Sequence, residues 1–360
     1  MRTLRSAAIL LANTSSVECA GPLLAELGFS DELVHLDDET RDRLGITSEI
    51  ESAHMSLGPG AMRALVAGVS GVEPIRETAG RLAGRLSSRT PHILWVLVLL
   101  HVESKQIAIA AWYSGQSAPR VVALIASQEQ IVDSDSETLC AMADAASDSD
   151  IATHSRWLEI LGRETVSRNF FRAMQASVAQ LASSLRPSVP ERPAAELALL
   201  YLSRLLFLSF LETKGWLDGD HAFLANQFAD CMRSGRGYHS GVLAPLFFGT
   251  LNTRPANRAR RAIAFGRVPF LNGGLFCRSA VERLYSDRIF SDESLGDVFG
   301  QLLTKYRFTA CEDSSVWSEA AVDPEMLGKA FEGLMAAPDR KSTGAFYTPQ
   351  ILVEQLTTSA

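Results

Sequence analysis

Ile93-Leu94-Trp95-Val96-Leu97-Val98-Leu99-Leu100 is an uninterrupted apolar run in the first third of the chain. Its length suits one β-strand and is far too short to cross a membrane. Similar runs follow at residues 107–112 and, after Ser114-Gly115, at residues 120–125. Three apolar runs separated by short polar segments predict an antiparallel β meander.

Glu103 and Lys105 lie in the polar segment between the first two runs and allow two interpretations. A Glu-x-Lys pair can hold Mg²⁺ through the carboxylate and orient an attacking water through the lysine, as in a nuclease. That chemistry also needs an acidic residue on a neighbouring strand, and it needs Glu103 and Lys105 inside a strand. We therefore favour a charged hairpin tip, with His101 at a strand end, and keep a Mg²⁺-dependent nuclease as the weaker alternative.

Residues before the meander are expected to form helices with polar breaks, including candidates at residues 20–28 and 62–69. The acidic stretch at residues 31–39 fits an exposed helix start. After the meander, residues 129–150 contain seven acids and no basic residue, which indicates a solvated connection. We therefore place a first, α+β domain at residues 1–150.

The following chain is expected to be mainly helical. Apolar residues recur at three- and four-residue intervals from Trp157 to Leu181, and a proline-rich segment at residues 186–193 breaks the pattern. A second helix runs from Ala194 to Lys214-Gly215 and is apolar nearly all round, which predicts a core helix. A later helix begins at Pro324 with Asp323 as its N-cap. These features define a helical domain at residues 151–338 of an α+β protein.

Composition fits a protein of the cytoplasm. The chain has 360 residues, a net charge of -7 and a pI near 5.6, so any contact with nucleic acid must be local. Its five cysteines are scattered, with no spacing typical of a disulfide framework or a metal site. No membrane segment is expected, because the longest apolar run, at residues 197–211, contains Arg204.

One short segment reverses the overall acidity. Residues 254–267 contain five arginines and no acid, which could contact the phosphates of duplex DNA. The other interpretation is a solvated segment whose arginines pair with the acidic N-terminal domain, and the sequence leaves both open. The candidate DNA-binding residues are Arg254, Arg258, Arg260 and Arg261.

Asn272-Gly273-Gly274 follows the arginines, with apolar residues on both sides. It predicts a tight turn, in which the glycines permit positive φ. They could instead let a ligand approach the backbone, although no phosphate-loop pattern follows.

Near its end the chain reads Arg340-Lys341-Ser342-Thr343-Gly344-Ala345-Phe346-Tyr347-Thr348-Pro349. Thr348 is a suitable N-cap and Pro349 suits the first helical position, so a further helix is expected there.

This motif, together with residues 324–335, resembles the entry to the methyltransferase domain of adenine-N6 DNA methyltransferases of the type IIG restriction-modification and phage-defence kind. Segments at residues 205–217, 246–252 and 268–276 occur in the order seen in the helical spacer of that family. The resemblance implies that Tyr347, Thr348 and Pro349 line part of an S-adenosylmethionine pocket. It also implies duplex DNA as a partner and methyl transfer to adenine N6.

The glycine-rich cofactor loop and the Asn-Pro-Pro-Tyr motif of that family do not occur in this sequence. Residues 339–360 are therefore expected to be the incomplete first segment of a Rossmann-like methyltransferase domain, and the chain is expected to be inactive alone, with no catalytic residue of its own. A separate chain could carry the methyltransferase core. The alternative function is a non-catalytic scaffold of a defence system that binds DNA or a partner.

Overall fold

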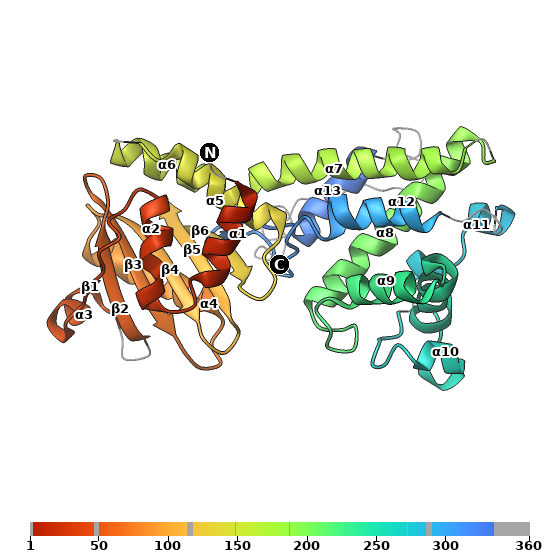
Figure 1. The fold of residues 1–360 in the computed structure, drawn as a ribbon, viewed down its shortest axis with the longest axis horizontal. Coiled ribbons are helices and arrows are strands. Elements are labelled where there is room, and N and C mark those ends of the chain that lie inside the picture. The colour runs from red at the N-terminus through yellow and green to blue at the C-terminus, as the bar shows by residue number, and fades with distance from the viewer. Residues whose placement is uncertain are drawn as a thin grey trace, which may run out of the picture. The chain divides into compact units, whose positions relative to one another are not determined.

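The computed structural model describes residues 3–46, 50–113, 118–147, 149–186, 188–271, 273–285 and 290–334. The chain divides into two compact units (Figure 1). Unit 1 comprises residues 1–168 and 311–322, and unit 2 comprises residues 169–310 and 323–360. Residues 339–360, expected to begin a methyltransferase domain, lie outside the described residues.

Unit 1 is built on a seven-stranded mixed sheet whose strands follow one another in chain order. The β3–β4 and β6–β7 pairs are parallel and the other pairs are antiparallel. The strands are β1 (Val34–His35), β2 (Ile50–Leu57), β3 (Met62–Val69), β4 (Leu94–His101), β5 (Gln106–Tyr113), β6 (Arg120–Ser127) and β7 (Trp317–Glu319). The predicted meander is confirmed as β4, β5 and β6.

Helices cover both faces of this sheet, which explains why its central strands are apolar on both sides. One face packs against α1 (Leu4–Asn13), α2 (Gly21–Glu26), α5 (Asp133–Ala145) and α6 (Asp150–Leu161), of which α1 and α2 are visible in Figure 1. The other face packs against α3 (Asp38–Leu44) and α4 (Ile75–Arg89). Alternate residues of β4 therefore enter different cores. Val96 and Val98 pack on the face covered by α1, α2, α5 and α6, and Leu97 and Leu99 pack on the face covered by α3 and α4.

Two expectations for unit 1 are wrong. Residues 62–69, expected to be helical, form strand β3, because a strand buried on both faces loses the polar alternation that would have identified it. The acidic segment after the meander, expected to be a solvated connection, contains helix α5. Ser134, Asp135, Ser136 and Thr138 of α5 are buried along with its apolar residues, so this segment belongs to the packed unit.

Two features extend unit 1 beyond residue 150. Helix α6 contributes Trp157 and Leu161 to the core. Strand β7, almost two hundred residues after β6, pairs with it from Val121↔Trp317 to Ala123↔Glu319. By contrast, the exposed helix start is confirmed at α3, where the Asp37 carboxylate accepts a hydrogen bond from the Thr40 amide (2.8 Å).

Unit 2 is helical in the described residues. Helix α7 (Arg163–Ser184) begins in unit 1 and continues into unit 2. The other α-helices are α8 (Glu191–Thr213), α9 (Phe223–Ser234), α10 (Arg260–Ile263), α11 (Ala280–Leu284), α12 (Asp292–Val298) and α13 (Pro324–Leu334). Short helices of other types are η2 (His239–Leu243), η3 (Pro245–Leu251), η4 (Pro255–Asn257), η5 (Gly274–Phe276) and η6 (Phe299–Leu303), of which η2, η3 and η6 are π-helical.

The predicted ends of two helices in unit 2 are confirmed. Helix α8 stops before Gly215, which has a φ of 68°. Helix α13 begins at Pro324, and the Asp323 carboxylate accepts a hydrogen bond from the Met326 amide (2.7 Å).

Helix α8 is long and apolar enough to cross a membrane, and 61% of its most apolar window is buried inside the protein. The core helix of a soluble protein has the same features, and the burial of α8 within unit 2 is the arrangement predicted for it.

Candidate nucleic-acid interface

The arginine-rich segment of unit 2, residues 254–267, contains all four predicted DNA-binding residues. It starts where the π-helix η3 ends, passes through the single turn η4 and the short helix α10, and ends in a turn around Gly266. Gly266 has a φ of 75°, which glycine adopts readily. The predicted cofactor residues Tyr347, Thr348 and Pro349 lie outside the described residues.

Arg258 differs from the other three predicted DNA-binding residues, because its guanidinium is bonded within the segment. Its Nε donates to the Thr253 carbonyl oxygen (3.2 Å) and its Nη1 donates to the Val268 carbonyl oxygen (2.9 Å). Its Nη2 is buried and has no hydrogen-bond partner. The guanidinium therefore holds the two ends of the segment together from inside. Sequence cannot distinguish an arginine that binds carbonyls from one that faces solvent, so this difference between Arg258 and its neighbours was not predicted.

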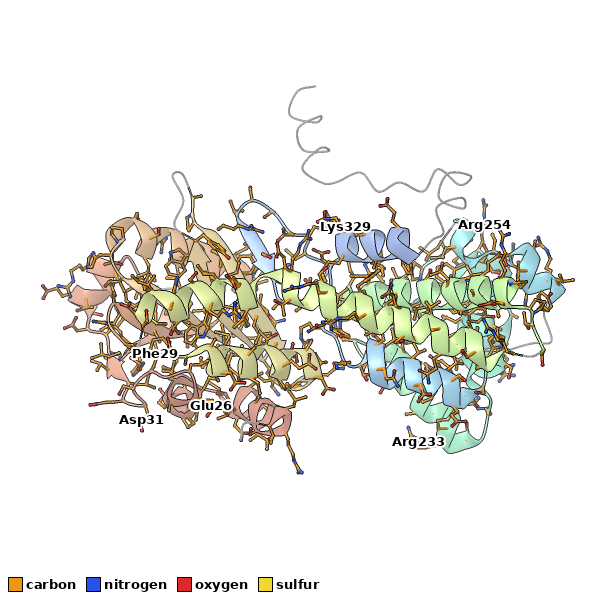
Figure 2. All side chains as sticks on the ribbon, turned by 90° about the horizontal axis from the view of Figure 1, so that it is seen from above. Glu26, Phe29, Asp31, Arg233, Arg254 and Lys329 are labelled. Carbon is orange, nitrogen blue, oxygen red and sulfur yellow. The ribbon has the colours of Figure 1, made fainter. Side chains whose placement is uncertain are left out.

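Arg254, Arg260 and Arg261 are exposed, and Arg254 lies at the surface of unit 2 (Figure 2). The one side-chain hydrogen bond that any of them makes within described unit 2 is long, from Arg261 Nη2 to the Gly241 carbonyl oxygen (3.4 Å). None of the three forms an ion pair within the described part of unit 2. Three cations on one short segment thus remain available to an external anion.

The turn that closes the segment is joined to the turn after α8. The Asp218 Oδ1 accepts a hydrogen bond from the Arg267 amide (2.8 Å), and the Asp218 amide donates to the Arg267 carbonyl oxygen (3.1 Å). The Arg267 side chain lies 3.7 Å from the same carboxylate and is 91% exposed.

A buried ion pair, which the sequence analysis did not identify, fixes the chain beyond the arginine segment. Arg204 of α8 is fully buried, and its Nη1 and Nη2 donate to the two carboxylate oxygens of Glu282 (2.6 and 2.9 Å). Its Nε and Nη2 also donate to the carbonyl oxygens of Leu275 and Cys277 (2.7 and 2.9 Å). Burial alone would raise the pKa of Glu282, but the hydrogen bonds from Arg204 and the Ser279 amide hold that pKa below its ordinary value. An arginine inside an otherwise apolar helix was the signal that could have predicted such a partner.

Gly273 and Gly274 lie just before the residues that Arg204 holds. Neither adopts the positive φ that glycine permits: Gly273 is extended, with a φ of -131°, and Gly274 begins the short helix η5. A Cβ added to either residue would meet nothing within 4 Å. Neither glycine is therefore required by packing within the described residues, and their exposed backbone stays open to an external group.

Tyr201 and His239 form a second polar contact in this region, with 2.6 Å between the Tyr201 hydroxyl and the His239 Nε2. Burial, assisted by the charge of Arg278, lowers the pKa of His239 to about 4. Burial likewise raises the pKa of Tyr201 above its ordinary range. Both groups are neutral near pH 7. This contact therefore adds no charge to the surface formed by Arg254, Arg260 and Arg261.

Glu103 and Lys105 lie between β4 and β5, not within either strand. Glu103 accepts a hydrogen bond from the Gly71 amide (3.1 Å), and Lys105 pairs with Glu129 (2.7 Å). Among the residues that the structure describes, no three His, Cys, Asp or Glu side chains gather closely enough to hold a metal ion. The geometry is that of a charged hairpin tip.

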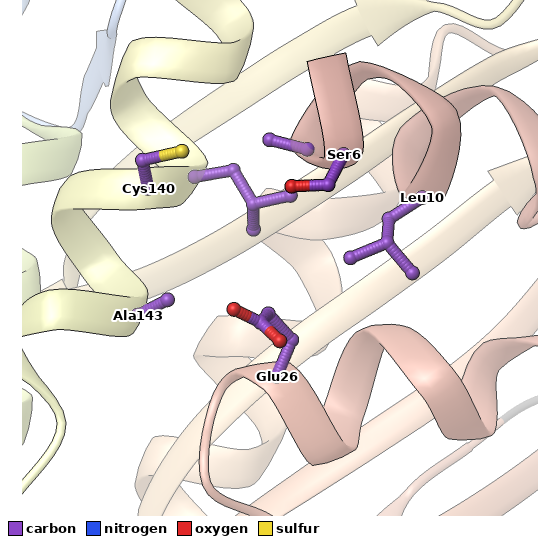
Figure 3. A pocket seen from close by; sticks show the side chains of 7 residues that line it. Ser6, Leu10, Glu26, Cys140 and Ala143 are labelled. Atoms are coloured by element: carbon purple, nitrogen blue, oxygen red, sulfur yellow. The ribbon is translucent and has the colours of Figure 1, made fainter. Parts of the chain in front are cut away.

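A small pocket in unit 1 lies among α1, α2 and α5 (Figure 3). Its lining is Ser6, Ala7, Leu10, Glu26, Leu139, Cys140 and Ala143. None of the predicted site residues lines it, and no charged group besides Glu26 reaches it. We assign it no chemistry.

Comparison with known proteins relates the chain to a restriction-modification protein. It is 33% identical over 172 residues to a Methanocaldococcus jannaschii protein named "putative type II restriction enzyme and methyltransferase". The aligned part covers 45% of this chain and 14% of the length of that relative. No family model matches the chain, and no solved structure matches it significantly. The relationship is to a restriction-modification protein, and the chain spans a small part of it.

Proposed function

We propose that this chain forms the N-terminal and spacer region of an adenine-N6 DNA methyltransferase of a restriction-modification or phage-defence system. The observation that carries the proposal is the relationship to a protein named as both a restriction enzyme and a methyltransferase. Arg254, Arg260 and Arg261 support the DNA-binding part of the proposal, because they are exposed and form no ion pair within described unit 2. Arg258 is a weaker candidate, because its guanidinium is bonded to the carbonyl oxygens of Thr253 and Val268.

In this proposal S-adenosylmethionine is the methyl donor, and Tyr347, Thr348 and Pro349 form one wall of its pocket. When bound, the cofactor would supply a methyl group to the exocyclic N6 of adenine, and that nitrogen would lose a proton. Unit 2 binds the DNA backbone through its positive charge and keeps it near the methyltransferase core. The core performs the transfer and belongs either to a longer form of this chain or to a partner chain. Phosphate contacts position the duplex, and sequence is read elsewhere.

The test is to delete the gene in its host and map N6-methyladenine across the genome. We expect one adenine-containing site to lose its methylation, and we expect the wild-type gene to restore it. A complementing gene with Tyr347→Ala should restore it poorly or not at all. Unchanged adenine methylation after deletion would contradict the proposal. DNA binding by the purified protein combined with unchanged methylation would favour the non-catalytic scaffold.

A further inference from the structure

Trp216 differs from every other tryptophan of the chain. Its residue surface is 53% exposed, whereas Trp95, Trp112, Trp157 and Trp317 are between 0% and 9% exposed. It lies in the turn that follows α8, between the positive-φ Gly215 and the fully buried Leu217. Tryptophan is normally well buried, so a half-exposed ring on an ordered turn indicates a surface that receives something.

The Trp216 turn and the arginine segment form one hydrogen-bonded surface. Asp218, two residues after Trp216, is bonded to Arg267 through its amide and its carboxylate. The contact is tight, because a Cβ on Gly266 would lie 2.4 Å from the Asp218 carboxylate. Arg258 then connects Val268 with Thr253. The turn that carries Trp216 is thus fixed to the segment that carries the exposed Arg260 and Arg261.

The charge of this surface is positive. Lys214, Arg260, Arg261 and Arg267 are all exposed. Of the nearby carboxylates, Asp218 is committed to Arg267, and Asp220 accepts hydrogen bonds from the Ala222 amide and the Asn226 side chain (2.8 and 2.9 Å). Ile263, 60% exposed, adds an apolar surface at the end of α10.

An exposed indole on a turn that is bonded to an arginine-bearing segment offers more than the binding of a duplex backbone requires. Binding of phosphates requires only the cations. The bases inside a duplex are stacked on their neighbours and offer no free face to an indole. An indole can stack on any base whose face is open, at a strand end, a junction or in a single strand, and such stacking tolerates every sequence.

We infer that Trp216 stacks on an unpaired DNA base while Arg260 and Arg261 contact the flanking phosphates. This inference rests on the proposed function, because it specifies the form of DNA that the same surface prefers. It predicts that a duplex with a single-stranded overhang binds more tightly than the same duplex with blunt ends.

The experiment follows binding of a dye-labelled blunt duplex and a matched overhang duplex by fluorescence anisotropy. The wild-type protein should favour the overhang duplex by about 5- to 100-fold. Trp216→Ala should remove the preference and leave blunt-duplex affinity nearly unchanged, whereas Trp216→Phe should keep part of the preference. Leu284→Ala, an exposed apolar control in α11, should behave as the wild type.

Tryptophan fluorescence gives an independent readout, because the four other indoles are buried. Overhang DNA should quench the emission of the wild-type protein and have little effect on Trp216→Phe. Equal affinity for the two duplexes, or equal quenching in Trp216→Phe, overturns the inference even though DNA binding persists. Absence of DNA binding in the anisotropy assay overturns both the inference and the DNA-binding part of the proposed function.

Discussion

At the scale of single residues, arginine has two opposite roles in unit 2. Arg204 and Arg258 direct their guanidinium groups at backbone carbonyls inside the fold, whereas Arg254, Arg260 and Arg261 are exposed. The planar guanidinium suits the first role because it offers several donors at fixed angles. Arg204 uses this capacity with four hydrogen bonds, two of them to one carboxylate.

The buried Arg204–Glu282 pair predicts how substitutions at these two residues change the stability of unit 2. Arg204→Met leaves a buried carboxylate and two carbonyl oxygens without their donor, so it should lower the stability of unit 2 by about 3–5 kcal/mol. Glu282→Leu should cost a similar amount. The double variant should cost clearly less than the sum, because it leaves no unpaired buried charge. Urea unfolding followed by circular dichroism measures all three.

The matched control is Arg172→Ala, an exposed arginine of α7, which should change stability by less than about 0.5 kcal/mol. Additive effects of the two single substitutions at Arg204 and Glu282 would show that the pair does not act as a unit. A loss below about 1 kcal/mol for Arg204→Met would contradict the structural role assigned to it.

At the scale of elements, one carboxylate joins the end of α8 to the start of α9. Glu212 Oε1 accepts a hydrogen bond from the Leu224 amide (2.8 Å), which is one of the amides that the helix itself cannot satisfy. Burial raises the pKa of Glu212 to about 7, against an ordinary value of 4.5, and the charge of Asp220 adds to the effect. The connection between the two helices therefore titrates near neutral pH.

The sign of the resulting pH dependence follows from the raised pKa. The folded state binds the Glu212 proton more tightly than the unfolded state, so its stabilising effect is complete below pH 4.5 and is lost as pH rises to about 7. Glu212→Gln keeps the carbonyl acceptor for Leu224 and removes the titration. Relative to this variant, the wild type should lose about 1–3 kcal/mol between pH 4.5 and pH 7.

Comparison with Glu212→Gln is necessary because His239 acts in the opposite direction. Its pKa is lowered to about 4, so it destabilises the fold as pH falls below the ordinary histidine value of 6.5. Chemical unfolding at several pH values gives the difference between the two proteins. A difference that stays constant from pH 4.5 to pH 7 would contradict the titration of Glu212.

The elements also show what sequence could and could not predict. Strands β4–β6, the ends of α8 and the start of α13 follow from local signals: apolar runs, a C-terminal glycine, and an Asp-Pro cap. Strand β3 was mistaken for a helix because burial on both faces removes its alternation. Strand β7 could not be foreseen, since three residues far along the chain complete the sheet of unit 1. The separate roles of Arg254 and Arg258 depend on which carbonyls the fold brings near each side chain.

At the scale of the whole molecule, a net charge of -7 has to be reconciled with DNA as a partner. Overall charge acts at long range and is screened within about 10 Å at 0.1 M salt. Phosphate contacts act at hydrogen-bonding distance, where Arg254, Arg260 and Arg261 face no carboxylate within described unit 2. A local surface can therefore bind DNA on an acidic protein, and the salt dependence of binding should report the number of its contacts.

The whole-molecule prediction compares two triple variants of equal charge. Arg254→Ala with Arg260→Ala and Arg261→Ala removes the proposed contacts, and Arg172→Ala with Arg192→Ala and Arg233→Ala removes three other exposed arginines of unit 2. Each changes the net charge from -7 by three, to -10. Only the first should weaken duplex binding, by on the order of tenfold or more near 0.1 M salt.

Measuring affinity from low to high salt separates direct contacts from overall charge. Each lost contact reduces the slope of log K against log salt by about 0.9, so the first variant should reduce it by about 2–3 and the second by much less than 1. Equal slopes for the two variants would show that duplex DNA senses only the total charge. The segment at residues 254–261 would then lose its role, because its arginines would contribute no more than arginines placed anywhere else on unit 2.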